Sequence, residues 1–338
     1  MSGCFFIFVL CIVSEKNYKS MKFTTPVAVA KSPHLMNYQT RFLSLGSCFA
    51  ENIGKKLNDL YFDIQINPSG IVFNPVSVAD CLYRLLEDKV FTEQELLCNR
   101  DLWFSYAHST LFSGINKDEV LNGINHAYEQ GRVQLLNADR IIITLGTAWV
   151  YQESESGRIV SNCHKLPANQ FVRRRLQVSE IVEIYKKLLP EIKAVNPAVR
   201  FIFTVSPVRH IRDGFHENNI SKSILHLFVE EITYLFEYVD YFPAWEIMMD
   251  ELRDYRFYAE DMLHPSGQAI DYIFEKFCIE YFDKATSDIM DEINAYNHNL
   301  NHRFIHPDSM DSELFRENLQ KQKNNILANY PFLTDRIQ

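Results

Sequence analysis

The sequence of 338 residues lacks three features: an excess of positive charge, paired cysteines, and a hydrophobic run long enough to cross a bilayer. Its formal net charge is −9, whereas a protein that binds nucleic acid broadly needs a basic face. The apolar run at residues 4–13 is about half as long as a membrane-spanning helix. We therefore expect no nucleic-acid partner and no stable membrane span.

The seven cysteines are scattered, and no two of them form a CxxC pair. An odd number at irregular spacing does not predict a disulfide framework and favours a reducing compartment, so we predict a cytoplasmic location. The cysteines and histidines follow no recognised zinc spacing, and we expect no metal.

Residues 1–20 make a poor signal peptide, because no Lys or Arg precedes the apolar run and no small-x-small cleavage site follows it. Met21 begins a more typical opening. We interpret residues 1–20 as an over-extended start. The alternative is a weak signal-like segment, which would make the protein exported or membrane-associated.

Three short apolar runs, at residues 41–45, 140–145 and 200–205, each end at a glycine or at Ser-Pro. Runs this apolar are typical of central parallel strands that are covered on both faces. Helical patterns lie between and after them, which indicates an α/β fold with a mainly parallel sheet. Ligands of such folds bind at the carboxyl ends of the strands.

The helical patterns carry three more expectations. Pro190 should kink or shorten the helix predicted over residues 181–192. The run Arg173, Arg174, Arg175 is interpreted as an exposed helix start. Ser266 is well placed to cap the helix that follows it, and after about residue 285 the pattern becomes a polar helical extension.

The triplet Gly46-Ser47-Cys48 directly follows a predicted strand and precedes a predicted helix. A side chain at a helix N-terminus lies beside unpaired N–H groups that favour negative charge. Cys48 should therefore have a lowered pKa and be nucleophilic, and the same N–H groups could hold an oxyanion. The structural alternative is a tight turn in which Ser47 caps the helix and Cys48 is merely buried.

A second motif, Asp261-Met262-Leu263-His264-Pro265, places a carboxylate three residues before a histidine. Asp261 can then orient the imidazole and stabilise its protonated form, which leaves the other ring nitrogen of His264 to serve as a base. Together with the strand, Gly-Ser-Cys and helix pattern, this pair predicts a nucleophile and its base.

These residues resemble the GSCFA family, a bacterial branch of the SGNH (GDSL-like) hydrolase superfamily. The resemblance runs from about residue 22 to residue 285. It is carried by the ordered motifs at residues 45–50, 67–75, 144–147, 204–210 and 261–265. It implies a flavodoxin-like three-layer α/β/α domain over residues 21–285, followed by a helical C-terminal extension over residues 286–338.

The resemblance also implies roles for single residues. The superfamily's serine nucleophile falls on Cys48, and Ser47 takes the place of its aspartate. Gly46 belongs to the same turn, and Gly70 corresponds to the superfamily's oxyanion glycine. The block that normally ends in an oxyanion asparagine starts at Gly146 and Thr147, but Ala148 stands where the asparagine would be. One side-chain donor of the usual oxyanion hole is therefore missing.

Further polar residues within the resembling segments are candidates for substrate binding. They are Asn74, Arg209, His210 and Lys222. Arg209 and Lys222 would hold an anionic group or a coenzyme A phosphate, or they form ordinary ion pairs.

We therefore predict acyl transfer through a covalent intermediate on Cys48, with a small-molecule or glycan acyl ester as substrate and no cofactor. A coenzyme A-dependent acyltransferase of polysaccharide or glycolipid biosynthesis is one alternative. A non-catalytic carbohydrate- or cofactor-binding module is the other, and the absent asparagine at Ala148 is its main support. The sequence leaves the oligomeric state open.

Overall fold

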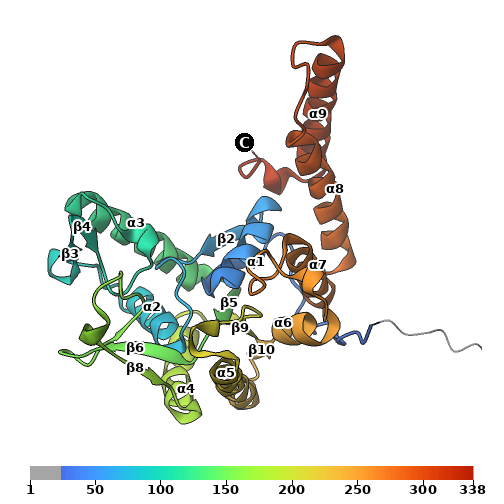
Figure 1. Cartoon of the computed structure of the whole chain (residues 1–338). Helices are drawn as coiled ribbons and strands as arrows, with labels where there is room; N and C mark the ends of the chain where they lie inside the picture. Colours follow the sequence, from blue (N-terminus) through green and yellow to red (C-terminus); the bar gives the residue numbers. More distant parts are fainter. Residues whose placement is uncertain (1–23, 338) are drawn as a thin grey trace, which may run out of the picture.

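The computed structural model describes residues 24–337, so the expectations for residues 1–20 concern a segment outside it. Five parallel strands form the central sheet in the order β10-β9-β5-β1-β2 (Figure 1). The strands are β1 (Arg41–Gly46), β2 (Asp63–Ile66), β5 (Arg140–Leu145), β9 (Arg200–Val205) and β10 (Val239–Tyr241). The three apolar runs are thus the three central strands, as predicted.

Both faces of the sheet are covered, because its strands are apolar on both sides. Phe42 and Ile142 belong to one core, and their neighbours Leu43 and Ile143 belong to the other. The first core is closed by α1 (Cys48–Asp59) and α7 (Gly267–Tyr281). The second is closed by α2 (Pro75–Glu87), α3 (Lys117–Asn137), α4 (Val178–Val195) and α5 (Phe215–Leu235). The predicted three-layer α/β/α fold is confirmed.

The order of the strands defines where a ligand would bind. The chain moves outward from β1 to β2, then returns to the other side of β1 to form β5, β9 and β10 in turn. The reversal lies between β1 and β5, and open α/β sheets bind ligands at the carboxyl end of such a switch point. Gly46 is the last residue of β1, so the Gly-Ser-Cys turn lies at this point.

The prediction of a helix start at the three arginines is wrong. Arg173, Arg174 and Arg175 belong to strand β8. They pair with Asp213, Glu180 and Glu217, and these partners stabilise a strand that carries three positive charges. The antiparallel sheet around them is formed by β6 (Trp149–Glu153), β7 (Ile159–Val160) and β8 (Phe171–Arg175), and a separate hairpin by β3 (Leu97–Asn99) and β4 (Leu102–Phe104).

Pro190 does not shorten its helix, which runs from Val178 to Val195. Its side chain is exposed, so the ring occupies solvent rather than core space. A proline inside a helix removes one hydrogen bond and costs about 3 kcal/mol. The buried residues Leu188, Leu189 and Ile192 around it supply the packing that maintains the helix.

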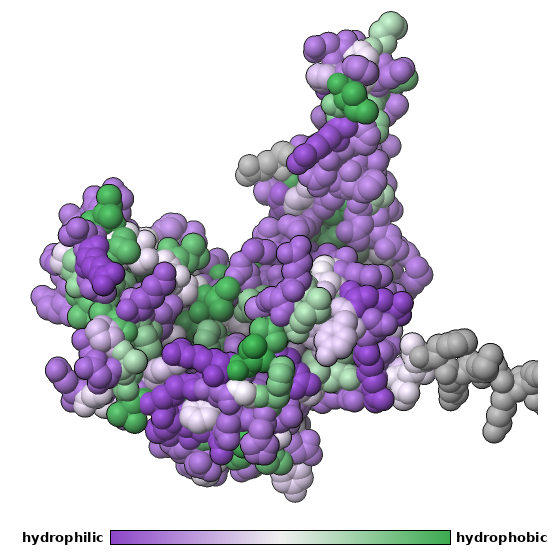
Figure 2. Space-filling view, in the orientation of Figure 1, coloured by the Kyte–Doolittle hydropathy of each residue, from purple (hydrophilic) through white to green (hydrophobic). Residues whose placement is uncertain are grey.

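The predicted C-terminal helices are present. The short α6 (Ala244–Glu246) precedes α7, and then α8 (Lys284–Leu300) and α9 (Met310–Asn329) project from the main body (Figure 1). The surface of this projection is largely hydrophilic in Figure 2, but Met290, Ile293 and Ile326 join the core beneath α1 and α7. Within residues 24–337, no helix is both long and apolar enough to cross a bilayer.

Candidate active site

The turn after β1 can be built only with glycine at its first position. Gly46 has a φ of +131°, and a Cβ at this position would lie 2.1 Å from the carbonyl oxygen of Thr144 on the neighbouring strand. That same oxygen accepts a hydrogen bond from the Ser47 N–H at 3.0 Å. The backbone of β1 therefore turns directly against β5 and delivers the next residues to the edge of the sheet.

Ser47 and Cys48 take different roles in this turn. Ser47 is 2% exposed, and its Oγ accepts from the Phe49 N–H at 3.2 Å, so it caps α1. Cys48 is the first residue of α1 and is only half-buried. The capping role that we weighed for Ser47 is therefore real, and the thiol is the more accessible nucleophile of the two.

The electrostatic environment of Cys48 differs from the sequence expectation. Burial raises the pKa of the thiol, and the Phe49 amide, the Lys222 charge and the amide of Cys48 itself offset this only in part. The expectation of a lowered pKa is wrong, because desolvation of the thiolate outweighs the helix N-terminus. A thiol of this kind needs a base.

Asp261 and His264 form a hydrogen-bonded pair of the kind that can serve as a base. The Nδ1 of His264 lies 2.6 Å from the Oδ2 of Asp261. The Oδ1 of the same carboxylate accepts from the Leu263 and His264 amides, each at 2.9 Å. These amides and the imidazole lower the pKa of Asp261 to about 2, so it stays ionised. Since Nδ1 faces the carboxylate, Nε2 is the ring nitrogen left to accept a proton.

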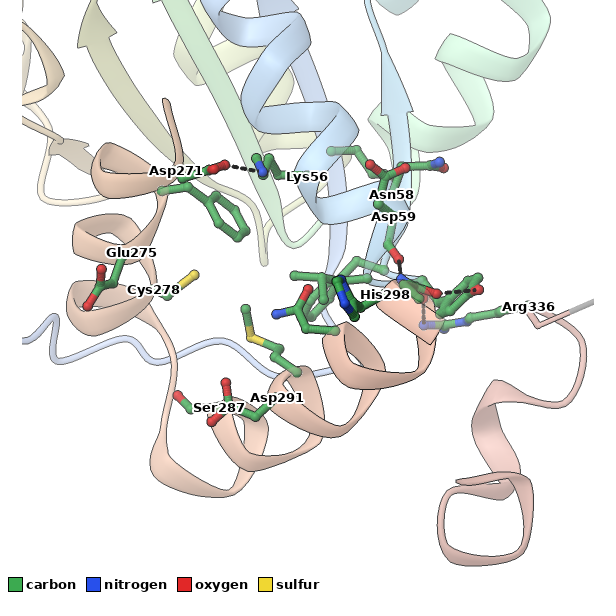
Figure 3. Close-up of a pocket in the computed structure, with 18 of the residues that line it drawn as sticks. Lys56, Asn58, Asp59, Asp271, Glu275, Cys278, Ser287, Asp291, His298 and Arg336 are labelled. Atoms are coloured by element: carbon green, nitrogen blue, oxygen red, sulfur yellow. Dashed lines mark hydrogen bonds and ion pairs between the residues drawn. The ribbon is translucent and has the colours of Figure 1, made fainter. Parts of the chain in front are cut away.

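Cys48 and His264 lie at the starts of two neighbouring helices. α1 and α7 pack in the same core layer (Figure 1) and are joined by an ion pair between Lys56 and Asp271 (Figure 3). Cys48 begins α1, and His264 lies three residues before α7. The N–H of Arg209, in the loop after β9, donates to the Leu263 carbonyl at 3.3 Å and ties the His264 loop to the carboxyl edge of the sheet.

The two glycines expected to supply oxyanion donors use their N–H groups inside their own loops. Gly70 donates to the Asn67 carbonyl at 2.7 Å, and Gly146 donates to the Phe73 carbonyl at 2.7 Å. In contrast, the N–H of Cys48 lies at the first position of α1, where no carbonyl of the helix can accept it. Of these three N–H groups, that of Cys48 is the one without a backbone acceptor in residues 24–337.

Two candidate substrate contacts have local partners instead. Asn74 caps α2: its Oδ1 accepts from the Ser77 N–H at 2.9 Å and its Nδ2 donates to the Ser77 Oγ at 2.8 Å. The hydroxyl of Thr147 lies 2.9 Å from the Ser221 Oγ and accepts from the Trp149 N–H at 3.1 Å. Both residues are buried, and these bonds shape the loops around the turn.

Arg209 and His210 line the carboxyl edge beyond β9. The guanidinium of Arg209 lies over the Trp245 ring, 5.1 Å from its centroid, and donates to the Asn219 Oδ1 at 2.9 Å. His210 stacks on Phe73, and its buried Nε2 has no hydrogen-bond partner in the described part of the chain. Burial, together with the nearby positive charge of Lys222, lowers the pKa of His210 to about 4, so its ring is neutral.

Sequence reasoning missed Asn67 as a site residue. Its Oδ1 accepts from the Gly46 N–H at 2.9 Å, while its Nδ2 is buried without a partner among residues 24–337. The sequence feature that could have identified Asn67 is its position as the first residue of the Asn-Pro-Ser-Gly segment that follows β2.

Sequence reasoning also misjudged the environment of Lys222, which we expected to bind a phosphate or to form an ordinary ion pair. Lys222 is 1% exposed, and its Nζ donates to the Ser206 carbonyl at 2.6 Å. Its spacing from Asn218 and Leu225 places it on the buried face of α5, which is the signal that could have identified it.

Two cavities lie away from this constellation. The larger one, of about 1280 Å³, lies where α1 ends and is lined by residues of β2, α7 and α8 (Figure 3). Lys56, Asp271 and His298 are among its labelled lining residues. The smaller one, of about 360 Å³, is lined by α2 and by the segments around Ser105 and Arg158. Neither is lined by Cys48 or His264, so volume alone does not locate the chemistry.

The molecule is a doubly wound α/β protein with a Gly-Ser-Cys turn at the switch point of its sheet and an Asp-His pair on a loop tied to the same edge. The pattern that defines the GSCFA family matches residues 41–277, which is more than half of the chain. The chain belongs to the GSCFA family.

Two solved structures are similar to this chain at low identity. One is a provisional acylhydrolase from Bacteroides fragilis, with 10% identity and a TM-score of 0.37, over 76% of this chain and 91% of that one. The other is an acetyl xylan esterase from the rumen bacterium Butyrivibrio proteoclasticus, with 12% identity and a TM-score of 0.35, over 72% of this chain and 63% of that one. A comparison with curated proteins gave no match.

Proposed function

We propose that this protein is an SGNH-type hydrolase that acts on ester bonds through a thiol nucleophile. The observation that carries the proposal is the 2.6 Å contact between Asp261 and His264, on a loop tied to the sheet edge where Cys48 emerges. A binding module has no need of an oriented imidazole beside a thiol. The Asp-His pair also meets a need of the nucleophile, because a thiol with a raised pKa requires a base to take its proton as it attacks.

The reaction follows from the positions of these groups. The Nε2 of His264 accepts the proton of the Cys48 thiol as the sulfur attacks the ester carbonyl. The C–S bond forms and the carbonyl π electrons move to oxygen. As the tetrahedral intermediate collapses, the protonated imidazole gives its proton to the departing alkoxide. Water, deprotonated by His264, then attacks the thioester, and the thiol leaves with the proton that His264 returns.

The oxyanion of the intermediate would be held by the N–H of Cys48 at the start of α1. Ala148 supplies no side-chain donor, and its own N–H is taken by the Ser221 Oγ at 2.7 Å. Asn67 offers an unused amide at this turn, since its Nδ2 has no partner among the described residues and its Oδ1 accepts from the Gly46 N–H.

A second candidate is acyl transfer to a hydroxyl group of a glycan. A thioester on Cys48 exchanges readily with coenzyme A, and water would then be replaced by a sugar as the acceptor. Trp149, a half-buried residue in the first strand position after β5, supports a sugar-binding role because its Nε1 has no hydrogen-bond partner among residues 24–337 and is an available donor for a sugar hydroxyl. Acetyl coenzyme A with and without a xylan acceptor separates transfer from hydrolysis.

The test of hydrolysis uses p-nitrophenyl acetate and a set of purified variants. We expect turnover in the wild type and a loss of about 100-fold or more in His264→Ala. His306→Ala is the matched control, because His306 is also followed by proline but has no carboxylate three residues before it. No turnover of any activated ester, with no effect of His264→Ala, would favour the binding module.

A further inference from the structure

Lys222 is a buried cation without an anionic partner. It is 1% exposed, and no carboxylate of residues 24–337 forms an ion pair with it. Its Nζ has a hydrogen bond to one carbonyl, that of Ser206, and lies 5.1 Å from the centroid of the Trp245 ring. A buried lysine costs stability unless an opposite charge or several acceptors compensate for it.

The ammonium lies on the same edge of the sheet as the thiol. Gly46, Thr144 and Thr204 form one row across β1, β5 and β9. At the end of β5, the Thr144 carbonyl accepts from the Ser47 N–H at 3.0 Å and the Leu145 carbonyl accepts from the Ser206 N–H at 2.9 Å, so the residue before Cys48 and the residue after β9 are bound to the same strand end. The Nζ of Lys222 reaches the Ser206 carbonyl from α5, so its charge lies at this end of β5. Cys48 and Lys222 shift each other's pKa, each toward its charged form.

We propose that Lys222 is the built-in counter-charge for the thiolate of Cys48 and acts on the reaction through that sulfur, as a positioning residue. The inference rests on the proposed role of Cys48 as nucleophile. When the thiol proton moves to Nε2 of His264, the sulfur becomes negative, and this charge favours the protonated form of Lys222. The ammonium thus stabilises the thiolate that attacks the carbonyl.

Several other titratable groups surround Lys222 and bear on its own protonation. They are the Arg209 charge and the neutral His210 ring from the loop after β9, and His226 from α5 itself, which in turn lies beside Glu246 of α6. Burial lowers the pKa of Lys222 to about 7; the Cys48 thiolate opposes this shift, and the Arg209 charge adds to it. The thiol and the ammonium therefore titrate as a coupled pair.

The test is the rate at which iodoacetamide alkylates Cys48, followed by peptide mass across pH 6 to 10. Lys222→Met keeps the length of the side chain and removes the charge. We expect its alkylation at pH 7 to slow about tenfold and its profile to move to higher pH, since a nearby opposite charge shifts a pKa by about 1 unit or more. Alkylation needs no ester turnover, so its result stands whether or not the protein hydrolyses esters.

Lys193→Met is the matched control. Lys193 also donates to a backbone carbonyl, that of Val199 at 2.8 Å, and lies 5.1 Å from an aromatic ring, that of Tyr238, but it is on α4. Its variant should leave the alkylation profile unchanged. A folded Lys222→Met protein with a wild-type profile would overturn the proposal.

If Lys222→Met does not fold, the coupling is measured from the other side. In the full-length Cys48→Ala variant, labelled lysine side chains are titrated by NMR. Loss of the thiolate should lower the pKa of Lys222 relative to the wild type. An unchanged titration of Lys222 would contradict the proposal equally.

Discussion

Asp261 contacts His264 twice: its Oδ2 lies 2.6 Å from the imidazole Nδ1, and its Oδ1 accepts from the His264 amide at 2.9 Å. One short segment therefore fixes both the backbone and the ring of the base. A base oriented in this way before substrate arrives loses little entropy when it reacts.

The first prediction concerns this pair. Asp261→Asn should lower kcat for p-nitrophenyl acetate by about 10² to 10⁴-fold with little change in KM, because the amide favours the wrong imidazole tautomer. Asp254→Asn is the control, since Asp254 accepts from the Arg256 N–H at 3.0 Å in the same loop region but caps a short helical turn. A kcat within threefold of wild type in Asp261→Asn would contradict a role for the pair.

The second prediction concerns pH. The hydrogen bonds of Asp261, above all that from the His264 amide, hold its pKa at about 2, below an ordinary value near 4. A lowered folded-state pKa contributes stability above the unfolded value, and this is lost as pH falls toward 2. The difference in Tm between wild type and Asp261→Asn should therefore be largest above pH 4 and shrink toward pH 2. It should be small throughout, because the carboxylate is half exposed. A difference that grows in acid would be inconsistent with this linkage.

The third prediction tests the turn. Gly46→Ala places a Cβ against the Thr144 carbonyl oxygen at a φ of +131°, so it should reduce the free energy of unfolding by at least about 2 kcal/mol. Gly123→Ala is the control on α3, where an added Cβ meets nothing within 4 Å, and it should stabilise the helix by about 0.5 to 1 kcal/mol. Urea denaturation measures both, and equal effects of the two substitutions would refute the steric argument.

The fourth prediction separates stability from activity. Ser266 caps α7, with its Oγ accepting from the Ala269 N–H at 3.3 Å, and it lies two residues beyond His264. Ser266→Ala should cost about 1 kcal/mol and also reduce turnover, because the start of α7 anchors the base. Ser309→Ala removes the matching cap of α9, where Ser309 accepts from the Ser312 N–H at 3.2 Å, and should cost stability alone. Turnover that falls equally in both would indicate a general loss of folded protein.

Much of the fold could be predicted from local patterns. The apolar runs identified the three central strands, because a strand that is buried on both faces is a continuous run of apolar residues. The helical spacing of apolar residues identified the helix capped by Ser266. The β8 strand could not be predicted in this way. Its arginines are stabilised by Asp213, Glu180 and Glu217, two of which lie about 40 residues away in the chain.

The site was predictable only where its contacts are local. The bond between Asp261 and His264 spans three residues, so spacing alone implied it. The N–H groups of Gly70 and Gly146, by contrast, were expected to bind an oxyanion, and their acceptors became visible only with the folded loops. Lys222 was expected to bind a phosphate or form an ordinary ion pair, because its coupling to Cys48 arises only when distant segments of the chain meet at one edge of the sheet.

The central claim is that Cys48 forms a covalent acyl intermediate, and intact mass spectrometry tests it most directly. The full-length protein is mixed with p-nitrophenyl acetate or acetyl coenzyme A and quenched in acid. The account predicts one added acetyl group on wild type and on Ser47→Ala, and none on Cys48→Ala. An adduct that persists in Cys48→Ala but disappears in Ser47→Ala would place the nucleophile on the capping serine and contradict the account.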